Sequence, residues 1–129
     1  MKLLSYVIPA VFLGYLYFNR SPTRNIPIGD NLVSPADGVI TGIRNNQIEI
    51  FIQITDVHIQ RAPFQGQITD IIQDNPMYNV IEMDTKLGHI TIERWAGELA
   101  RTVITDVKPY QYVEKGQILG RILLGSHTS

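Results

Sequence analysis

The sequence predicts a mainly β protein, in which an N-terminal membrane helix precedes a compact antiparallel β sandwich or barrel-like body. Two patterns lead to this fold class. Residues 3–18 form an apolar run without a charge, and beyond residue 32 apolar and polar residues alternate in short stretches. Alternation with a period of two is typical of strands that bury one face. A chain of 129 residues has room for one small domain beside one membrane element.

Residues 1–20 are predicted to be a membrane anchor helix. At about 1.5 Å per residue the apolar run covers roughly 24 Å, slightly less than the ~30 Å hydrocarbon core of a bilayer, so we expect a short or shallow span. No small-residue cleavage site follows the run, so we expect no signal peptidase cleavage. Arg20 and Arg24 after the run, against Lys2 before it, favour a cell-membrane protein with its body on the cytoplasmic side. A buried core helix is the alternative interpretation.

Residues 21–31 are rich in Pro, Asn and Gly and are predicted to be a linker, and residues 32–129 form the β-rich domain. Tight turns are expected at residues 44–46 and 86–88. Seven strands are predicted from the alternating stretches: Gly38–Ile43, Gln47–Ile54, Gln67–Gln73, Tyr78–Met83, His89–Trp95, Arg101–Val107 and Gln117–Leu124.

The amino-acid composition excludes several kinds of partner and active site. The net charge is −1, from 11 basic and 12 acidic residues, so the chain lacks the basic field that nucleic-acid binding requires. It contains no cysteine, which excludes disulfides, zinc-thiolate sites and cysteine nucleophiles. We therefore expect no nucleic acid partner and no bound metal. If the protein uses a nucleophilic side chain, we expect it to be a serine.

The dipeptide Gly125-Ser126 near the end of the chain is a candidate site of self-cleavage. A serine hydroxyl can attack the carbonyl of the preceding glycine and exchange the amide for an ester when the backbone is strained. Elimination and hydrolysis would then release ammonia and convert Ser126 into a pyruvoyl group. A Gly-Ser pair taken alone is more often an ordinary loop or tail, so this interpretation depends on its neighbours.

Asp37 and His58 are the candidate assistants. His58 lies at a predicted strand end, and an imidazole that titrates near neutral pH can take the proton of Ser126 and return it later. A carboxylate such as Asp37 would orient the imidazole and stabilise its charged form. The alternatives are a turn carboxylate that bonds neighbouring amides and a packed or exposed histidine.

Six blocks of sequence follow one another along the chain. They are Tyr17-Phe18-Asn19-Arg20-Ser21-Pro22-Thr23-Arg24, Ser34-Pro35-Ala36-Asp37-Gly38, Asp56-Val57-His58-Ile59-Gln60-Arg61-Ala62-Pro63-Phe64-Gln65-Gly66, Ala96-Gly97-Glu98-Leu99-Ala100-Arg101, Lys115-Gly116-Gln117-Ile118-Leu119-Gly120-Arg121-Ile122 and Leu124-Gly125-Ser126. In this order the blocks resemble the short branch of the phosphatidylserine decarboxylase family. The resemblance implies a proenzyme that cleaves itself at Gly125-Ser126 into a β chain and an α chain carrying a covalent pyruvoyl cofactor. It also implies that Asp37 and His58 assist cleavage or decarboxylation.

The resemblance further implies a membrane phospholipid substrate, phosphatidylserine or archaetidylserine, whose serine headgroup loses carbon dioxide to give ethanolamine. The pyruvoyl group would accept the electrons of the broken bond. Arg61, Arg101 and Arg121 are candidates for the lipid phosphate on charge alone, with ordinary solvation of strand ends as the alternative. The sequence leaves open whether the protein is a homo-oligomer.

The chain departs from the family pattern in two places. Longer members carry a second histidine three residues after the first, where Arg61 stands here, so His58 could serve cleavage, decarboxylation or both. The family also continues with further strands past the serine, whereas this sequence stops at Ser129. We therefore expect a fragment, a truncated gene product or an inactive relative.

Two other functions are consistent with parts of the sequence. A biotinyl or lipoyl carrier module has similar hairpins but needs a lysine at an exposed tip, for which Lys86 is the candidate. A membrane-anchored adaptor without an active site would leave the aspartate, histidine and Gly-Ser blocks unexplained. Replacement of Ser126 distinguishes both from a self-cleaving enzyme.

Overall fold

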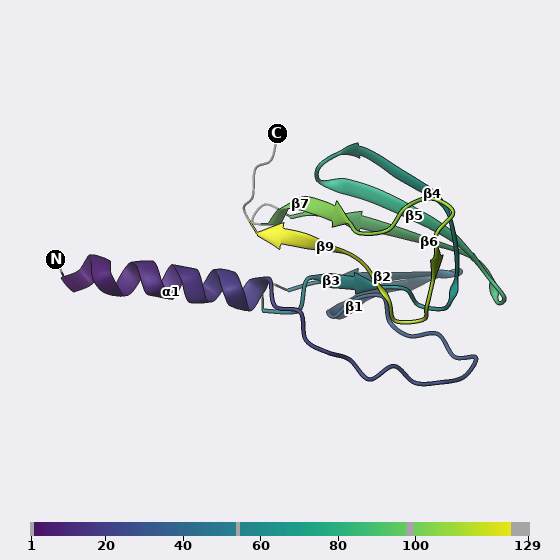
Figure 1. Ribbon diagram of the computed structural model, residues 1–129, viewed down its shortest axis with the longest axis horizontal. Coiled ribbons are helices and arrows are strands. Elements are labelled where there is room, and N and C mark those ends of the chain that lie inside the picture. Colours follow the sequence, from purple (N-terminus) through teal and green to yellow (C-terminus); the bar gives the residue numbers. More distant parts are fainter. Residues whose placement is uncertain (1, 54, 98–99, 125–129) are drawn as a thin grey trace.

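The computed structural model describes residues 2–53, 55–97 and 100–124. One helix projects from a β body in which the described strands form three antiparallel sheets (Figure 1). The sheet orders are β6-β5-β4-β8, β3-β9-β7 and β1-β2. The elements are α1 (Lys2–Phe18), β1 (Val39–Arg44), β2 (Gln47–Phe51), β3 (Ile59–Arg61), β4 (Gly66–Asn75), β5 (Tyr78–Thr85), β6 (Gly88–Trp95), β7 (Ala100–Thr105), β8 (Tyr112–Val113) and β9 (Ile118–Leu124).

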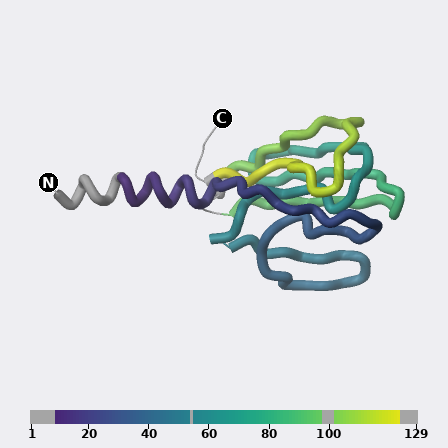
Figure 2. Tube along the Cα trace, turned by 60° about the horizontal axis from the view of Figure 1, so that its bottom comes forward, coloured from purple at the N-terminus to yellow at the C-terminus, as the bar shows by residue number. Residues whose placement is uncertain are grey.

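Helix α1 confirms the predicted helix but not the predicted membrane span. It has 17 residues, or about 25 Å at 1.5 Å per residue, against ~30 Å of hydrocarbon. Within the described part of the chain, no helix combines the length and apolar character needed to cross a membrane. The helix points away from the body (Figures 1 and 2), and large apolar side chains such as Phe12, Leu13 and Leu16 are exposed along it.

The seven predicted strands all form, with ends that differ from the predicted ends by no more than three residues. Both predicted turns are also present, and Asn46 adopts a positive φ of 59°, a conformation that asparagine tolerates. Strands β3 and β8 were not predicted. They have three and two residues, which is too short to show alternation in the sequence.

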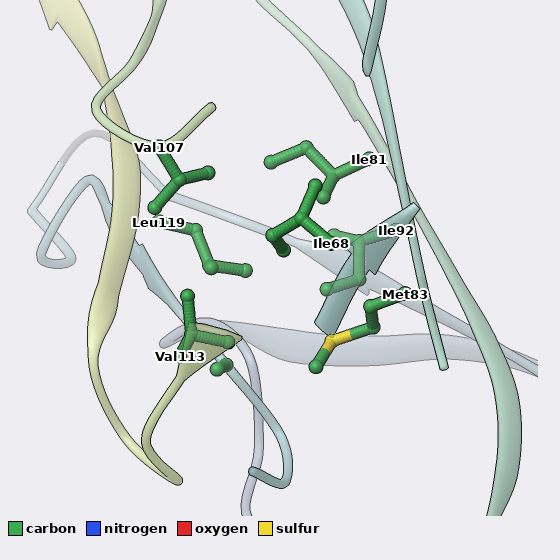
Figure 3. Packing of buried hydrophobic residues seen from close by; sticks show 8 residues of the cluster. Ile68, Ile81, Met83, Ile92, Val107, Val113 and Leu119 are labelled. Atoms are coloured by element: carbon green, nitrogen blue, oxygen red, sulfur yellow. The ribbon is translucent and has the colours of Figure 1, made fainter. Parts of the chain in front are cut away.

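The main hydrophobic core lies between the four-stranded sheet and β9 (Figure 3). Apolar side chains of β4, β5 and β6 meet those of β8 and β9 and of the loops. The core residues are Ala62, Ile68, Ile81, Met83, Ile92, Val107, Val113 and Leu119. A second, smaller cluster consists of Phe18, Ala96, Val103 and Ile122. The last residue of α1 therefore belongs to the body.

A buried arginine connects the two larger sheets. Arg94 on β6 is 4% exposed, and its guanidinium donates hydrogen bonds to Asn79 on β5, to Gln60 on β3 and to β7. Its partners on β7 are the carbonyl of Ile104 and the hydroxyl of Thr105. This polar bridge holds the three-stranded sheet, and with it the site described below, against the rest of the body.

The segment between α1 and β1 has no helix or strand but packs on the body. Val33 donates its backbone N–H to the carbonyl of Pro63, and the N–H of Arg61 donates to the carbonyl of Pro35. Gly116, at φ 80°, leaves room for Ile26 where a Cβ would collide with it. The predicted linker is thus laid along the domain, whereas hairpin β1–β2 leaves its apolar side chains largely exposed at the bottom of Figure 2.

Candidate functional site

The site forms where β3 begins beside the C-terminal half of β9. Strand β9 is the central strand of its sheet, and the N–H of Ile122 donates to the carbonyl of His58 at 2.9 Å. This register places His58 opposite a residue only four positions before Ser126. Gly125 and Ser126, the predicted cleavage pair, lie outside the described residues.

The imidazole of His58 is buried and is only 6% exposed. Its ring stacks on the ring of Phe18, with 3.7 Å between centroids and 21° between planes. A cavity of about 10 Å³ adjoins it, lined by Phe18, Asn19, Arg20, His58, Ile59, Arg121 and Ile122. That volume is about one water molecule. Among the described residues, Nδ1 of His58 has no hydrogen-bond partner.

Burial lowers the pKa of His58 below its ordinary value of 6.5, because a charged imidazolium loses solvation there. The backbone and charge of Asp56 raise the pKa by a smaller amount, and the positive charge of Arg20 lowers it further. The net effect favours the neutral ring at neutral pH. A neutral imidazole with an unpartnered nitrogen can accept a proton, which is the property that a general base needs.

Asp37 has a different partner from the one expected. Its Oδ2 lies 2.6 Å from Nη2 of Arg24, in an ion pair whose side chains are 44% and 40% exposed. Asp37 lines a separate cleft of about 170 Å³ that also contains Arg61 but not His58. Within the described part of the chain, no hydrogen bond or ion pair joins Asp37 to His58. Orientation of His58 by Asp37 therefore stays a prediction.

The three candidate phosphate-binding arginines differ in their surroundings. Arg61 is half-buried and donates to the backbone carbonyls of Gly116 and Pro22, so its guanidinium holds the chain together. Arg121 lines the His58 cavity and is half exposed, with Nη2 3.5 Å from a carboxylate oxygen of Asp106. The side chain of Arg101 lies outside the described residues. Of the two candidates whose side chains are described, Arg121 is the one that the structure brings to His58.

Sequence interpretation missed two residues of this site, Phe18 and Arg20. Arg20 donates to the carbonyls of Tyr17 and Thr55, both at 2.8 Å, and so ties the end of α1 to the loop before His58. The apolar run of residues 3–18 had been assigned entirely to the membrane. A signal was nevertheless available, because Phe18 and Arg20 belong to one of the six sequence blocks.

Lys86, the candidate attachment lysine of a carrier module, lies in the turn between β5 and β6. Its side chain is 75% exposed, and Nζ lies 3.8 Å from a carboxylate oxygen of Asp30. The lysine is therefore at a hairpin tip, as a carrier would require. Its hairpin, β5–β6, belongs to the four-stranded sheet, whereas β3 and β9 beside His58 belong to the three-stranded sheet.

Comparison with known proteins assigns the chain to a family. The phosphatidylserine decarboxylase family model matches residues 12–77. A putative archaetidylserine decarboxylase proenzyme of Methanosarcina barkeri is 30% identical over 95% of this chain and 67% of its own length. A protein of the same description from Archaeoglobus fulgidus is 34% identical over 96% of this chain and 71% of its own.

A phosphatidylserine decarboxylase proenzyme of Carboxydothermus hydrogenoformans is 30% identical, over 92% of this chain and 68% of the relative. The matched regions extend over nearly the whole chain, which spans about two thirds of the length of these relatives. The matches to residues 12–77 include both the Asp37 turn and the His58 loop. The chain belongs to the phosphatidylserine decarboxylase family.

Proposed function

We propose that this chain is the proenzyme of a phosphatidylserine or archaetidylserine decarboxylase, which cleaves itself between Gly125 and Ser126. The names of its relatives support the reaction class. The observation that carries the proposal is the buried His58, whose Nδ1 is unpartnered and whose backbone is bonded to Ile122. Ser126 follows Ile122 by four residues, a separation that the chain can span with at most about 14 Å.

In the proposed cleavage, Oγ of Ser126 attacks the carbonyl carbon of Gly125 while His58 accepts the hydroxyl proton. The C–O ester bond forms, the C–N amide bond breaks, and the proton returns to the released nitrogen. Elimination then removes the Cα proton of residue 126 and breaks its Cβ–O bond, which releases the Gly125 carboxylate and leaves dehydroalanine at position 126. Hydrolysis of that residue releases ammonia and leaves a pyruvoyl group at the new N-terminus.

The described residues fit a pyruvoyl group formed beside His58. The imidazole is buried, its lowered pKa favours the neutral ring, and its Nδ1 has no partner in the described part of the chain. The adjoining cavity has room for about one water molecule. When present, the pyruvoyl carbonyl supplies an acceptor for the electrons released as carbon dioxide leaves. In this proposal His58 holds the proton that replaces the lost carboxylate of the serine headgroup.

Substrate binding is assigned to Arg121 and to α1. Arg121 is half exposed at the mouth of the His58 cavity, where its guanidinium can pair with the lipid phosphate. The exposed apolar side chains of α1 would enter one leaflet without crossing the bilayer and bring the body to the headgroups. Arg20 and Arg24 would face the anionic surface, with the body on the cytoplasmic side.

Intact mass spectrometry of the purified chain tests self-cleavage. The wild type should separate into residues 1–125 and 126–129, and Ser126→Ala should remain whole. Ser21→Ala changes an exposed serine that is distant from Ser126 in the sequence. It is the matched control and should cleave like the wild type. A wild-type chain that keeps its full mass would contradict self-cleavage by this chain and would agree with a fragment, an inactive relative, a carrier or an adaptor.

A second measurement tests the decarboxylation. Cleaved chain mixed with vesicles that contain phosphatidylserine or archaetidylserine should release carbon dioxide and form the ethanolamine lipid. Arg121→Gln should raise KM more than it lowers kcat if the guanidinium binds the phosphate. Unchanged kinetics in this variant would remove Arg121 from the substrate site.

A further inference from the structure

Phe18 differs from the other large apolar residues of α1. Its side chain is 3% exposed, whereas Leu13, Leu16 and Tyr17 are 64%, 49% and 54% exposed. It packs with Ala96 and the other residues of the second core cluster, which come from the body. A residue that served only as a membrane anchor would be directed outward like its neighbours, so Phe18 has another role.

That role is indicated by its contact with His58. The two rings are stacked at 3.7 Å, and Phe18 covers one face of the imidazole. Arg20, two residues later, donates to the carbonyls of Tyr17 and Thr55 and so bridges the helix end to the loop that leads into β3. The end of α1 and the His58 loop are therefore held together by a ring stack and by a guanidinium.

We propose that Phe18 is a positioning residue for His58: its ring holds the imidazole with Nδ1 unpartnered, beside the segment that leads to Ser126. This inference rests on the proposed function, because it assigns the reason for the positioning to the reaction at Ser126. The last turn of α1 is thereby part of the reaction site as well as the support of an exposed apolar helix.

The ring has a physical effect on His58 that can be measured. Burial is the main reason that the pKa of His58 lies below its ordinary value, and the stacked ring of Phe18 covers one face of the imidazole. Among the described residues, the charged groups that face His58 are Asp56 on its own loop, Arg20 after α1 and Arg121 on β9. A substitution at Phe18 changes none of these charges and keeps the backbone of residue 18, whose hydrogen bond raises the pKa of His58, so a shift on substitution reports the ring.

The experiment is a histidine NMR titration of the full chain in detergent, with the His58 signal assigned from a His58→Gln variant. Cross-relaxation between the ring protons of Phe18 and His58 should be visible in the wild type. Phe18→Ala should raise the pKa of His58 toward its ordinary value of 6.5. Leu16→Ala, which shortens an exposed residue of the same helix, is the control and should leave His58 unchanged.

The cleavage reaction gives the second readout. Phe18→Leu keeps an apolar side chain in the cluster but loses the flat ring. It can therefore replace Phe18→Ala in the experiment if that variant does not fold. It should slow cleavage roughly 10- to 100-fold, which is the scale expected for a misplaced catalytic group. Phe18→Tyr keeps the ring and should retain cleavage close to that of the wild type.

The outcomes separate this inference from the proposed function. Unchanged His58 titration and unchanged cleavage in Phe18→Leu would overturn the positioning role, whatever the reaction. A titration that moves with Phe18 in a chain that never cleaves, wild type included, would support the contact and overturn the reaction at Ser126. Changes in both, absent from Leu16→Ala, would support the inference in full.

Discussion

Arg94 donates two hydrogen bonds to the same side-chain oxygen of Asn79, from Nε at 3.1 Å and from Nη2 at 2.6 Å. With its bonds to Gln60, Ile104 and Thr105, all five N–H groups of the guanidinium are used. Burial lowers the pKa of Arg94 to about 10, against a smaller opposing effect of Asp106. The group therefore remains charged at neutral pH, held largely by neutral oxygens.

Arg94→Met should destabilise the fold strongly. The substitution leaves the buried side-chain oxygens of Asn79 and Gln60 without their donor, and each buried acceptor that loses its partner costs about 1–3 kcal/mol. Urea denaturation measures the change in the free energy of unfolding. Arg44→Met, at an exposed position of β1, is the control and should change it by less than about 0.5 kcal/mol. Equal effects of the two variants would show that the network contributes little.

Gly120→Ala should also destabilise the protein. A Cβ at Gly120 would collide with the carbonyl oxygen of Ile104 and with Nη1 of Arg94, and the first of these is backbone that cannot move aside alone. We expect a loss of about 1–3 kcal/mol, the usual cost of overpacking. Gly97→Ala, where no atom lies within 4 Å of the added carbon, is the matched control in the same urea experiment. A Gly120→Ala variant as stable as Gly97→Ala would contradict the close packing of β9 on β7.

Asp37→Asn should affect self-cleavage without changing the free energy of unfolding appreciably. Its ion pair with Arg24 is more than 40% exposed on the carboxylate side, and exposed pairs contribute about 0–1 kcal/mol, so the unfolding curve should hardly move. If Asp37 assists self-cleavage, as the family resemblance implies, the intact mass should show loss of cleavage. Asp30→Asn, at a more exposed aspartate, should cleave normally. Normal cleavage in Asp37→Asn would restrict the residue to a turn and its ion pair.

The stability of the protein should depend on pH through His58. Because the pKa of His58 is lowered in the folded state, its neutral form fits the fold, and stability is complete above the unfolded value of 6.5. As the pH falls through 6.5 toward the folded pKa, the unfolded chain binds the extra proton and stability decreases. Thermal unfolding between pH 5 and 8 should show this decrease in the wild type and a smaller one in His58→Gln.

The contribution of His89 to stability should depend on pH in the opposite direction from that of His58. A hydrogen bond that His89 Nδ1 donates to the Asp84 carboxylate at 2.7 Å raises the pKa of His89, so the contribution of His89 to stability is complete below 6.5 and is lost as the pH rises through the folded pKa. His89→Gln should therefore lose stability mainly on the acid side of the transition. If both histidine variants changed the thermal profile with the same sign, the assignment of their environments would be wrong.

Local sequence patterns predicted the strands of this fold with good accuracy. The alternation in His89–Trp95, for example, corresponds to β6, and the residues just before it form a predicted turn. Such features depend on residues close together in the sequence: a strand that buries one face alternates apolar and polar residues, and a turn requires particular residue types. Strands β3 and β8 show no such pattern, because two or three residues become a strand only when a longer strand pairs with them.

The candidate site also combines a residue that the sequence predicted with contacts that only the structure shows. His58 was recognised from its sequence block, and the tertiary structure decided what surrounds it: Phe18 on its face, Ile122 on its carbonyl and Arg121 at its cavity. It also gave Asp37 another partner, Arg24.

The sequence by itself determined the family, the mainly β class and the residue types on which the proposed chemistry depends. Only the tertiary structure decided that the apolar run of residues 3–18 ends inside the body at Phe18, and that the buried Arg94 joins two sheets through its hydrogen bonds. These contacts join residues 15 to 40 positions apart. Periodicity cannot encode them, because they arise from the packing of complete elements and from the demand that buried polar groups find partners.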